Sequence, residues 1–312
     1  MILTITMNPS VDIFYRLNTL HTDDVNRCND YQKTAGGKGL NVTRVIQQMD
    51  QPVIATGLIG GPLGIFIQEE LDKQGISHKF SHIRGSTRNC IAILHDEGKQ
   101  TEILESGPSV SEVEQADFLT LYSDLIKKSE VVTMSGSLPQ GVSNTFYADL
   151  LKLTAGETKV ILDSSGESLK QALLGKSKPY AIKPNETEIA QLLNVSAEDM
   201  EHIPVVELLE DSLFEGIPLI VVSKGADGAL VKYHDELFVV SIPKVKAINP
   251  VGSGDSTVAG LAIGLLQDKS IEDVIKTGMT LGILNAMQEQ TGFVNPAHFD
   301  ELFSKINVDK IA

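Results

Sequence analysis

Two glycines and a carboxylate stand together near the C-terminus, in Asn249-Pro-Val-Gly-Ser-Gly-Asp255, just before an apolar-periodic run. The first turn of a helix attracts anions through its unpaired N–H groups, and Gly252, Ser253 and Gly254 would let a phosphoryl oxygen approach them. An anion site needs no carboxylate, so Asp255 indicates a base that takes a proton from an attacking hydroxyl. This combination is typical of phosphoryl transfer to an alcohol. The alternative is a simple helix cap beside a glycine turn.

A second glycine-rich turn, Ala35-Gly-Gly-Lys-Gly-Leu-Asn41, precedes another amphipathic stretch. It lacks the spacing before Lys-Ser/Thr that defines a P-loop, which excludes a P-loop NTPase. Together with Asn8-Pro-Ser-Val-Asp12, the two turns match the signature regions of the PfkB (ribokinase-like) family of sugar kinases in order and separation. The chain resembles this family over essentially its whole length.

The resemblance implies that Asp12, Gly37 and Asn41 bind the sugar. A carboxylate only accepts hydrogen bonds and therefore suits the hydroxyl donors of a polyol, whereas an amide both donates and accepts. Glycine at position 37 would let the backbone approach the sugar. For Asp12 a turn aspartate is the alternative, because it follows Asn-Pro-Ser.

Four further residues are candidates for binding a phosphate that the sugar already carries. In members of the family that act on sugar phosphates, a basic residue stands at the position of Arg88, and arginine suits this task through its fixed fork of donors. An ordinary surface arginine is the alternative. Lys38 and Arg27 are weaker candidates, and Ser137 in Ser135-Gly-Ser-Leu-Pro139 would add a hydrogen bond.

The segment Lys183-Pro-Asn-Glu-Thr-Glu188 matches the Asn-x-x-Glu element of the family, which implies ATP as the phosphoryl donor with Mg²⁺. Asn185 and Glu188 would hold the hydrated ion through oxygen ligands, and Lys183 and Asn185 would face the nucleotide. A capping box between Asn185 and Glu188 is the alternative, and both interpretations are compatible.

A glycine-containing segment, Ser223-Lys-Gly-Ala-Asp-Gly228, resembles the loop on the nucleotide side of the family's site, with Ser223, Gly225 and Gly228 near phosphate or ribose. The sequence departs from the family's pattern at Asn249, where many members of the family carry an acidic residue. It leaves open whether the chain has a site for a monovalent cation.

The elements that must position these residues alternate along the chain. Continuous apolar runs predict strands buried on both faces, as in a parallel sheet between helices, at 2–6, 53–58, 131–134, 160–162, 180–182 and 219–222. Helical spacing predicts helices at 63–74, 115–127, 185–193, 256–266, 271–288 and 298–305. The expected fold is therefore α/β and ribokinase-like, a mostly parallel sheet flanked by helices.

Two stretches do not follow this alternation of strands and helices. Residues 11–20 with 31–34, and 89–95 with 101–105, read as short antiparallel strands joined by hairpins. We expect a small β lid, from about 11–34 and 89–106, within a single domain of residues 1–312. The resemblance implies that the lid covers the sugar and forms a homodimer; an ordinary edge ribbon is the alternative.

Composition narrows the possible partners. A net charge of −15 and a pI near 4.9 disfavour nucleic acid, which binds to surplus lysine and arginine. No apolar run is long enough to span a bilayer, and the N-terminus has no basic region typical of a secretion signal, so we expect a cytoplasmic protein without membrane contact. Cys28 and Cys90 are too few for a disulfide framework and are expected to be buried free thiols.

The resemblance is strongest to the branch of the family that phosphorylates ketohexose phosphates. We expect ATP-dependent phosphorylation of tagatose 6-phosphate at its C1 hydroxyl, with fructose 1-phosphate as the alternative substrate. Two further hypotheses are a kinase for an unphosphorylated sugar or nucleoside, and a sugar sensor without turnover. The sequence leaves open the epimer that is preferred, the oligomeric state and any allosteric nucleotide site.

Overall fold

Strands buried on both faces form the centre of this computed structural model, which describes residues 1–154, 156–200 and 202–312. Among these residues an 11-stranded sheet has the order β15-β14-β13-β12-β11-β10-β9-β1-β4-β5, with β6 paired to β4. Its parallel part confirms the predicted strands and consists of β1 (Ile2–Thr6), β4 (Val53–Ile59), β5 (Ser77–His78), β6 (Ser81–His82), β9 (Val131–Ser135), β10 (Lys159–Asp163), β11 (Ala181–Ile182) and β12 (Leu219–Ser223).

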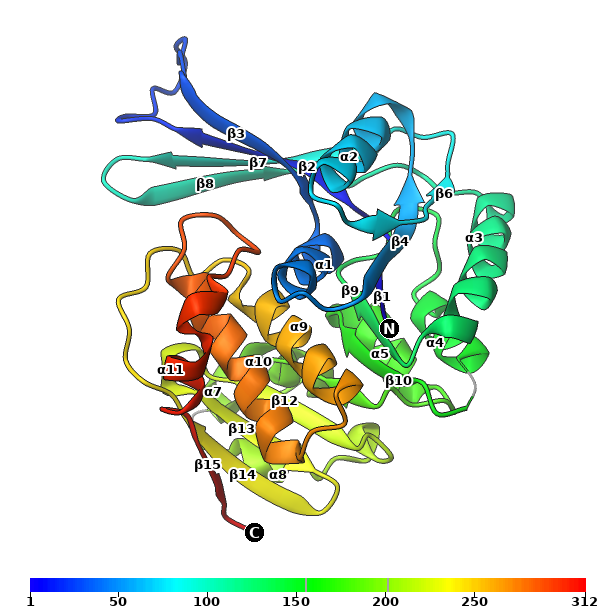
Figure 1. The fold of residues 1–312 in the computed structure, drawn as a ribbon, viewed down its shortest axis with the longest axis vertical. Coiled ribbons are helices and arrows are strands. Elements are labelled where there is room, and N and C mark those ends of the chain that lie inside the picture. Colours follow the sequence, from blue (N-terminus) through cyan, green and yellow to red (C-terminus); the bar gives the residue numbers. More distant parts are fainter. Residues whose placement is uncertain (155, 201) are drawn as a thin grey trace.

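One edge of this sheet is antiparallel, which the sequence did not predict. It is formed by β13 (Ala229–Tyr233), β14 (Glu236–Ser241) and β15 (Asn307–Lys310). The C-terminal strand β15 thus returns to close the edge beside β14 (Figure 1).

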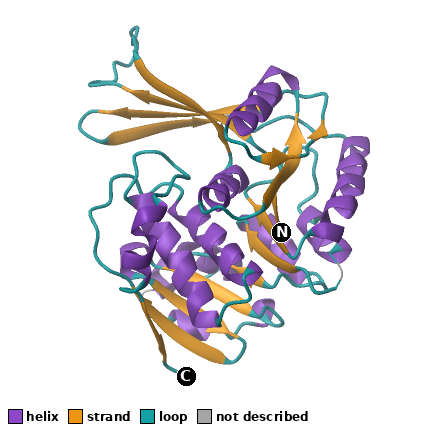
Figure 2. Cartoon of the chain, in the orientation of Figure 1, coloured by secondary structure: helices purple, strands orange, loops and turns teal. Residues whose placement is uncertain are grey.

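Helices cover both faces of the sheet (Figures 1 and 2). One face carries α1 (Lys38–Gln48), α9 (Ser253–Leu266), α10 (Ile271–Ala286) and α11 (Phe299–Phe303). The other face carries α3 (Glu112–Leu125), α4 (Phe146–Leu153), α5 (Gly166–Leu174), α6 (Glu186–Leu193) and α8 (Val205–Leu208). The short helix α7 (Ala197–Met200) follows α6, and 3₁₀ turns lie at Ile126–Lys128, Ser212–Phe214, Gly225–Asp227 and Pro296–His298.

The strands divide their side chains between these two helical layers. Leu3 and Ile5 of β1 join one hydrophobic cluster, whereas Ile2 joins the other. Val132 and Val131 of β9 are divided in the same way, as expected from the period of two along a strand. This explains why the strands are apolar at every position.

Helices α9 and α10 pack with their backbones unusually close. A Cβ on Gly260 would lie 2.5 Å from the carbonyl oxygen of Thr277, and one on Gly264 would lie 2.8 Å from Cα of Val274. α9 is buried from Asp255 to Leu265. It begins at Ser253, three residues before the predicted start, because its polar first turn shows no apolar periodicity.

The predicted lid is a separate four-stranded sheet that extends away from the main body (Figure 1). It consists of β2 (Ser10–Arg16), β3 (Asp30–Gly36), β7 (Arg88–His95) and β8 (Lys99–Leu104), in the order β3-β2-β7-β8. Both predicted antiparallel hairpins are present, and β2 and β7 join them as a parallel pair. Helix α2 (Gly61–Lys73) packs beside β2 and β3 at the base of the lid.

The prediction that both cysteines are buried is wrong. Cys28 and Cys90 are free and only half-buried. Both belong to the lid region, which is a single sheet layer and not part of the sheet that helices cover on both faces. This explains why both cysteines are partly exposed. In the described part of the chain, none of the helices is both long enough and apolar enough to cross a membrane.

Candidate active site

The two glycine-rich turns lie at the N-termini of α1 and α9, which pack against each other. Gly37 and Gly252 are the N-cap residues, with φ angles of 101° and 82° that disfavour any side chain. Neither helix has a side-chain cap. In α9 the N–H of Ser253 donates to the carbonyl oxygen of Pro250 at 3.2 Å, and the N–H groups of Gly254 and Asp255 are available to an anion, as are the first two N–H groups of α1. A cavity of about 470 Å³ lies between these two turns and the inner side of the lid.

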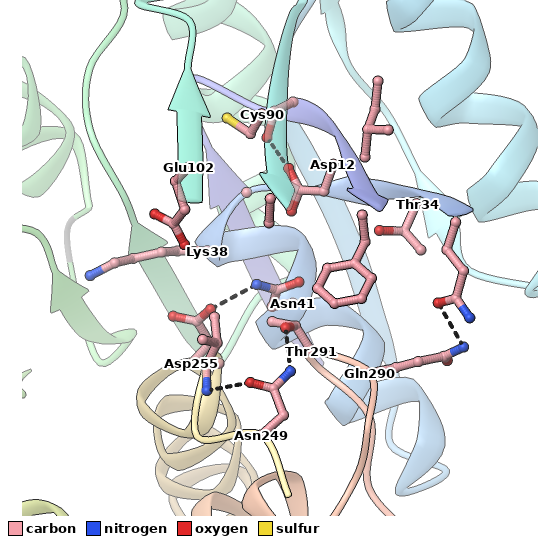
Figure 3. Close-up of a pocket in the computed structure, with 18 of the residues that line it drawn as sticks. Asp12, Thr34, Lys38, Asn41, Cys90, Glu102, Asn249, Asp255, Gln290 and Thr291 are labelled. Atoms are coloured by element: carbon pink, nitrogen blue, oxygen red, sulfur yellow. Dashed lines mark hydrogen bonds between the residues drawn. The ribbon is translucent and has the colours of Figure 1, made fainter. Parts of the chain in front are cut away.

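Asp255 lies in the first turn of α9 and faces this cavity. It is 6% exposed, and its Oδ2 accepts a hydrogen bond of 2.8 Å from Nδ2 of Asn41, toward which it points in Figure 3. Burial and the nearby charge of Asp163 raise the pKa of Asp255 from 3.8 to about 6. A carboxyl group with this pKa is ionised at neutral pH and is a stronger base than an exposed aspartate.

Asp163, at the end of β10, lies between two lysines at the bottom of the cavity. Nζ of Lys38 is 3.4 Å and Nζ of Lys183 is 3.5 Å from its carboxylate oxygens. Burial alone would raise the pKa of Asp163, but the two lysines outweigh it and hold the pKa below its usual value. Asp163 in turn raises the pKa of Lys38. The cavity therefore keeps two positive charges beside the uncapped helices.

Asp12 lines the side of the cavity that the lid forms. Its Oδ1 accepts a hydrogen bond of 2.6 Å from the hydroxyl of Ser10, and its carboxylate occupies the space that a side chain on Gly36 would need. Burial raises its pKa, against the opposing effect of the Ser10 hydrogen bond. Asp12, Gly37 and Asn41, the three residues predicted to bind sugar, thus line one cavity.

A second cavity of about 210 Å³ shares Gly37, Lys38 and Arg88 with the first. Ser137 lies on its wall, and Nη2 of Arg88 donates to the carbonyl oxygen of Asn8 at 3.1 Å. The side chains with unpaired buried polar atoms in this region are those of Thr6, Asn8, Arg88 and Ser135. Hydroxyls and two cations in a polar cavity of this size suit a phosphate group.

The candidates for the nucleotide and the metal lie on adjoining loops. Asn185 and Glu188 form the capping box of α6: each side chain accepts the other's backbone N–H, at 2.8 and 2.9 Å. Ser223 lies against this turn, since its N–H bonds the carbonyl oxygen of Pro184 at 3.0 Å. The 3₁₀ turn that contains Gly225 follows directly, and Gly228 begins the return to β13. Lys183 lines the first cavity, whereas these residues line neither cavity.

Of the four candidates for binding the sugar's phosphate, Arg27 is the one that the structure does not bring to the cavities. It is exposed in the connection between β2 and β3 and lines neither cavity. Asn249 faces the first cavity, and its Nδ2 donates to the hydroxyl of Thr291 at 3.4 Å (Figure 3) and to the carbonyl oxygen of Glu289 at 3.0 Å. It therefore joins the turn before α9 to the loop after α10.

Sequence reasoning missed several residues of the site. Asp163 directly follows the predicted strand 160–162, at the strand end where α/β sheets place functional groups, so its position was a usable signal. Arg44 in α1 is 2% exposed although its neighbours read as an ordinary amphipathic helix. The loop after α10, which contributes Thr291 and Phe293 to the cavity, has no recognisable motif.

The similarities to known proteins extend over both glycine-rich turns of this site. A family model described as pfkB family carbohydrate kinase matches residues 5–298. A Staphylococcus aureus protein, named provisionally as a phosphofructokinase, is 29% identical, with a TM-score of 0.83 over 100% of this chain and 99% of its own. A Thermotoga maritima protein, named provisionally as a 1-phosphofructokinase, is 24% identical, with a TM-score of 0.88 over 100% of both chains. Escherichia coli phosphofructokinase-2, in complex with potassium, is 25% identical over 97% of this chain and 98% of its own, with a TM-score of 0.85.

Proposed function

Because the chain belongs to the pfkB family of carbohydrate kinases, we propose that it transfers a phosphoryl group from ATP to the C1 hydroxyl of tagatose 6-phosphate. The products are tagatose 1,6-bisphosphate and ADP. The observation that supports this most is the position of Asp255: a buried carboxylate, held by Asn41, at the uncapped N-terminus of α9.

Asp255 is the general base of the proposed reaction. Asn41 occupies its Oδ2, which leaves Oδ1 for the hydroxyl of the sugar. With a pKa of about 6, the carboxylate is largely ionised at pH 7 and accepts the proton as the oxygen attacks phosphorus. The turnover number should therefore fall as the pH drops below about 6.

The transferred phosphoryl group would lie against the first turn of α9. Catalysis of phosphoryl transfer consists mostly of positioning and of stabilising negative charge. Here the backbone N–H groups of Gly254 and Asp255 supply one set of donors, and Lys183 supplies a cation, since its Nζ lies 3.1 Å from where a Cβ on Gly254 would stand. Asp163 fixes that lysine in place.

The capping box of α6 leaves ligands for a hydrated Mg²⁺. Glu188 uses Oε2 in the box, so its Oε1 is free, and its charge acts on Lys38, which lines the cavities. Mg²⁺ prefers oxygen ligands and retains several waters, so Glu188 and Asn185 fit an ion that also binds phosphates. When bound, the ion would neutralise the charge of the triphosphate. Among the described residues no cluster of three His, Cys, Asp or Glu side chains could hold a metal by itself.

We assign the existing phosphate of the sugar to the second cavity, where Arg88, Lys38 and Ser137 converge. A ketohexose furanose is nearly symmetric when its two CH₂O arms are exchanged. One site can therefore hold a phosphate on one arm and present the other arm to Asp255. The wall of the first cavity, with Asp12 in it, would bind the ring hydroxyls.

The same symmetry supports fructose 1-phosphate as a second candidate substrate. The names of two similar structures also support this candidate, since one is named provisionally as a phosphofructokinase and the other provisionally as a 1-phosphofructokinase. A sugar sensor without turnover is less well supported, because such a protein would not need the base Asp255.

The decisive experiment measures ADP release with tagatose 6-phosphate, fructose 6-phosphate, fructose 1-phosphate, ribose and adenosine. We expect the highest kcat/KM with tagatose 6-phosphate and measurable activity with fructose 6-phosphate, because the two differ only at C4. A preference for fructose 1-phosphate would establish the second candidate. Activity confined to ribose or adenosine would refute the sugar-phosphate assignment and the role of Arg88.

We also propose that two chains associate through their lids, and that the protein works in the cytoplasm, where ATP and sugar phosphates are available. The lid exposes apolar side chains that the rest of the chain does not cover. Tyr31 and Ile103, which the strand register places on the same face of the lid, are 56 and 55% exposed. Burying them against a second lid would remove this apolar surface from water.

A further inference from the structure

Arg44 is a buried cation to which the proposed chemistry assigns no role. It lies on α1 and is 2% exposed. Its guanidinium donates to the carbonyl oxygen of Ala35, to Oδ1 of Asn41 at 3.1 Å and to the carbonyl oxygen of Thr291 at 3.3 Å. The ring of Phe293 lies 5.2 Å from its Cζ. Burying a charge this completely costs free energy unless hydrogen bonds compensate for it. The partners of Arg44 therefore indicate what its buried position achieves.

The contact with Asn41 determines how that amide is oriented. An asparagine side chain has nearly the same shape after its oxygen and nitrogen exchange places, so packing alone does not choose between the two orientations. Arg44 has only donors and therefore faces the amide oxygen. The amide nitrogen must then face Asp255, where it donates at 2.8 Å.

We propose that Arg44 is a positioning residue that orients the amide of Asn41, so that Asn41 always presents a donor to the carboxylate of Asp255. This inference rests on the proposed function, because it assumes that Asp255 works as a base. In the opposite orientation, the oxygen of Asn41 would face a carboxylate oxygen. That arrangement is favourable only when Asp255 is protonated and thus unable to accept a proton.

The other charged groups around these residues do not set this orientation. Asp163 lies beside Asp255 and disfavours its ionisation, whereas Lys38 and Lys183 favour it, and none of the three bonds the amide. Asp12, Asp255 and Glu70 act on Arg44 through their charges. Burial lowers the pKa of Arg44 to about 10, so it remains a cation and a donor at neutral pH.

The test compares Arg44→Met with the wild-type chain across the pH range. Losing the oriented donor should move the acidic limb of kcat to higher pH. For a rise of one pH unit from about 6, kcat falls roughly fivefold at pH 6 and less than about 1.5-fold at pH 8, while KM for ATP stays the same. A uniform loss at every pH would overturn the inference, because it would indicate a general structural defect.

Gln48→Met is the matched control. Gln48 lies on the same helix and holds the same loop as Arg44, accepting from the N–H of Val294 at 2.7 Å, but it does not contact Asn41. Its pH profile should match the wild type. If it shifts as in Arg44→Met, the effect comes from the loop and the inference fails.

A double variant gives a second test. The shift that Arg44→Met causes should disappear when this change is made in an Asn41→Ala background, since the two changes interrupt one connection. A shift that persists there would likewise overturn it.

Arg44→Lys guards against a methionine variant that does not fold. Lysine also carries only donors but lacks the fork that bonds Asn41 and a carbonyl together, so we expect a smaller shift in the same direction, and a loss of kcat that is equal at every pH would refute the inference. Asp255→Asn separates the two proposals. If the wild-type chain phosphorylates none of the sugars, the proposed function fails, but the ionisation of Asp255 remains measurable as the difference in unfolding free energy between the wild type and Asp255→Asn across pH. Removing Arg44 from both proteins should then move that difference to higher pH, and an unmoved difference would contradict the inference.

Discussion

Replacing Asp255 by asparagine should make the protein inactive and more stable at once. Asparagine has the shape of a protonated carboxyl group and still accepts the hydrogen bond from Asn41, but it cannot take a proton. We expect kcat to fall by roughly 10²-fold or more, the scale typical of a lost general base, with little change in nucleotide affinity.

The gain in stability follows from the pKa. The native fold raises the pKa of Asp255 from 3.8 to about 6, chiefly through burial. At about 1.4 kcal/mol per tenfold change in the ionisation constant, keeping this group ionised costs the native state on the order of 3 kcal/mol. Because the raised pKa belongs to an acid, the wild type binds this proton more tightly when folded. Its stability therefore falls as the pH rises from about 4 to about 6.

Denaturant unfolding of both proteins across this pH range measures the difference. Asp255→Asn should exceed the wild type by about 1 kcal/mol at pH 4.5 and by about 3 kcal/mol at pH 7.5, since only the wild type carries the buried charge. Equal stability at pH 7.5 would refute the raised pKa, even if activity were lost. A gain that is the same at both pH values would show that packing, and not charge, distinguishes the two proteins.

The remaining predictions concern four other positions. Arg88→Ala should raise KM for the sugar phosphate far more than for ATP, because we assign the guanidinium to the sugar phosphate alone; steady-state kinetics with each substrate varied would contradict this by giving equal changes. Glu188→Gln should raise the Mg²⁺ concentration needed for half-maximal rate, whereas lower thermal stability with an unchanged metal requirement would leave only the capping role. Gly260→Ala should lower the unfolding free energy by about 1–3 kcal/mol, since its Cβ would meet the backbone of α10; an unchanged denaturation midpoint would show that the helices move apart freely. Ile103→Lys should weaken dimers in sedimentation experiments, and dimers of unchanged strength would place the interface away from this side of the lid.

The sequence predicted those parts of the fold that depend on local patterns. Strands buried on both faces are apolar at every position, so β1 and β9 were recognisable without knowledge of their neighbours. The glycine turns were equally clear, because a positive φ and an uncapped helix leave few residue types possible. Asp255 was predicted as the base because a carboxylate is unexpected at an anion site, and the structure places it in the first turn of α9.

What the sequence did not predict depends on tertiary pairing. The parallel contact of β2 with β7 joins residues that are 78 positions apart, such as Ser10 and Arg88, and the sequence of neither strand indicates which strand it pairs with. β15 is largely exposed and so has no apolar pattern to identify it. From the sequence, Arg44 would be predicted to lie at the surface. Its burial is explained only by its tertiary partners, the side chain of Asn41 and two backbone carbonyl oxygens.

The close backbone packing of α9 against α10 also bears on how such an enzyme can diverge. Along α9 almost any new side chain meets neighbouring atoms, so descendants that keep the fold inherit this helix nearly unaltered. The lid faces the same cavity from a thin sheet, and its lining side chains, such as Gln32, Thr34 and Glu102, can be exchanged without disturbing a core. Lineages with different sugar preferences should therefore differ mainly in the lid, while the phosphoryl-transfer helix stays recognisable in all of them.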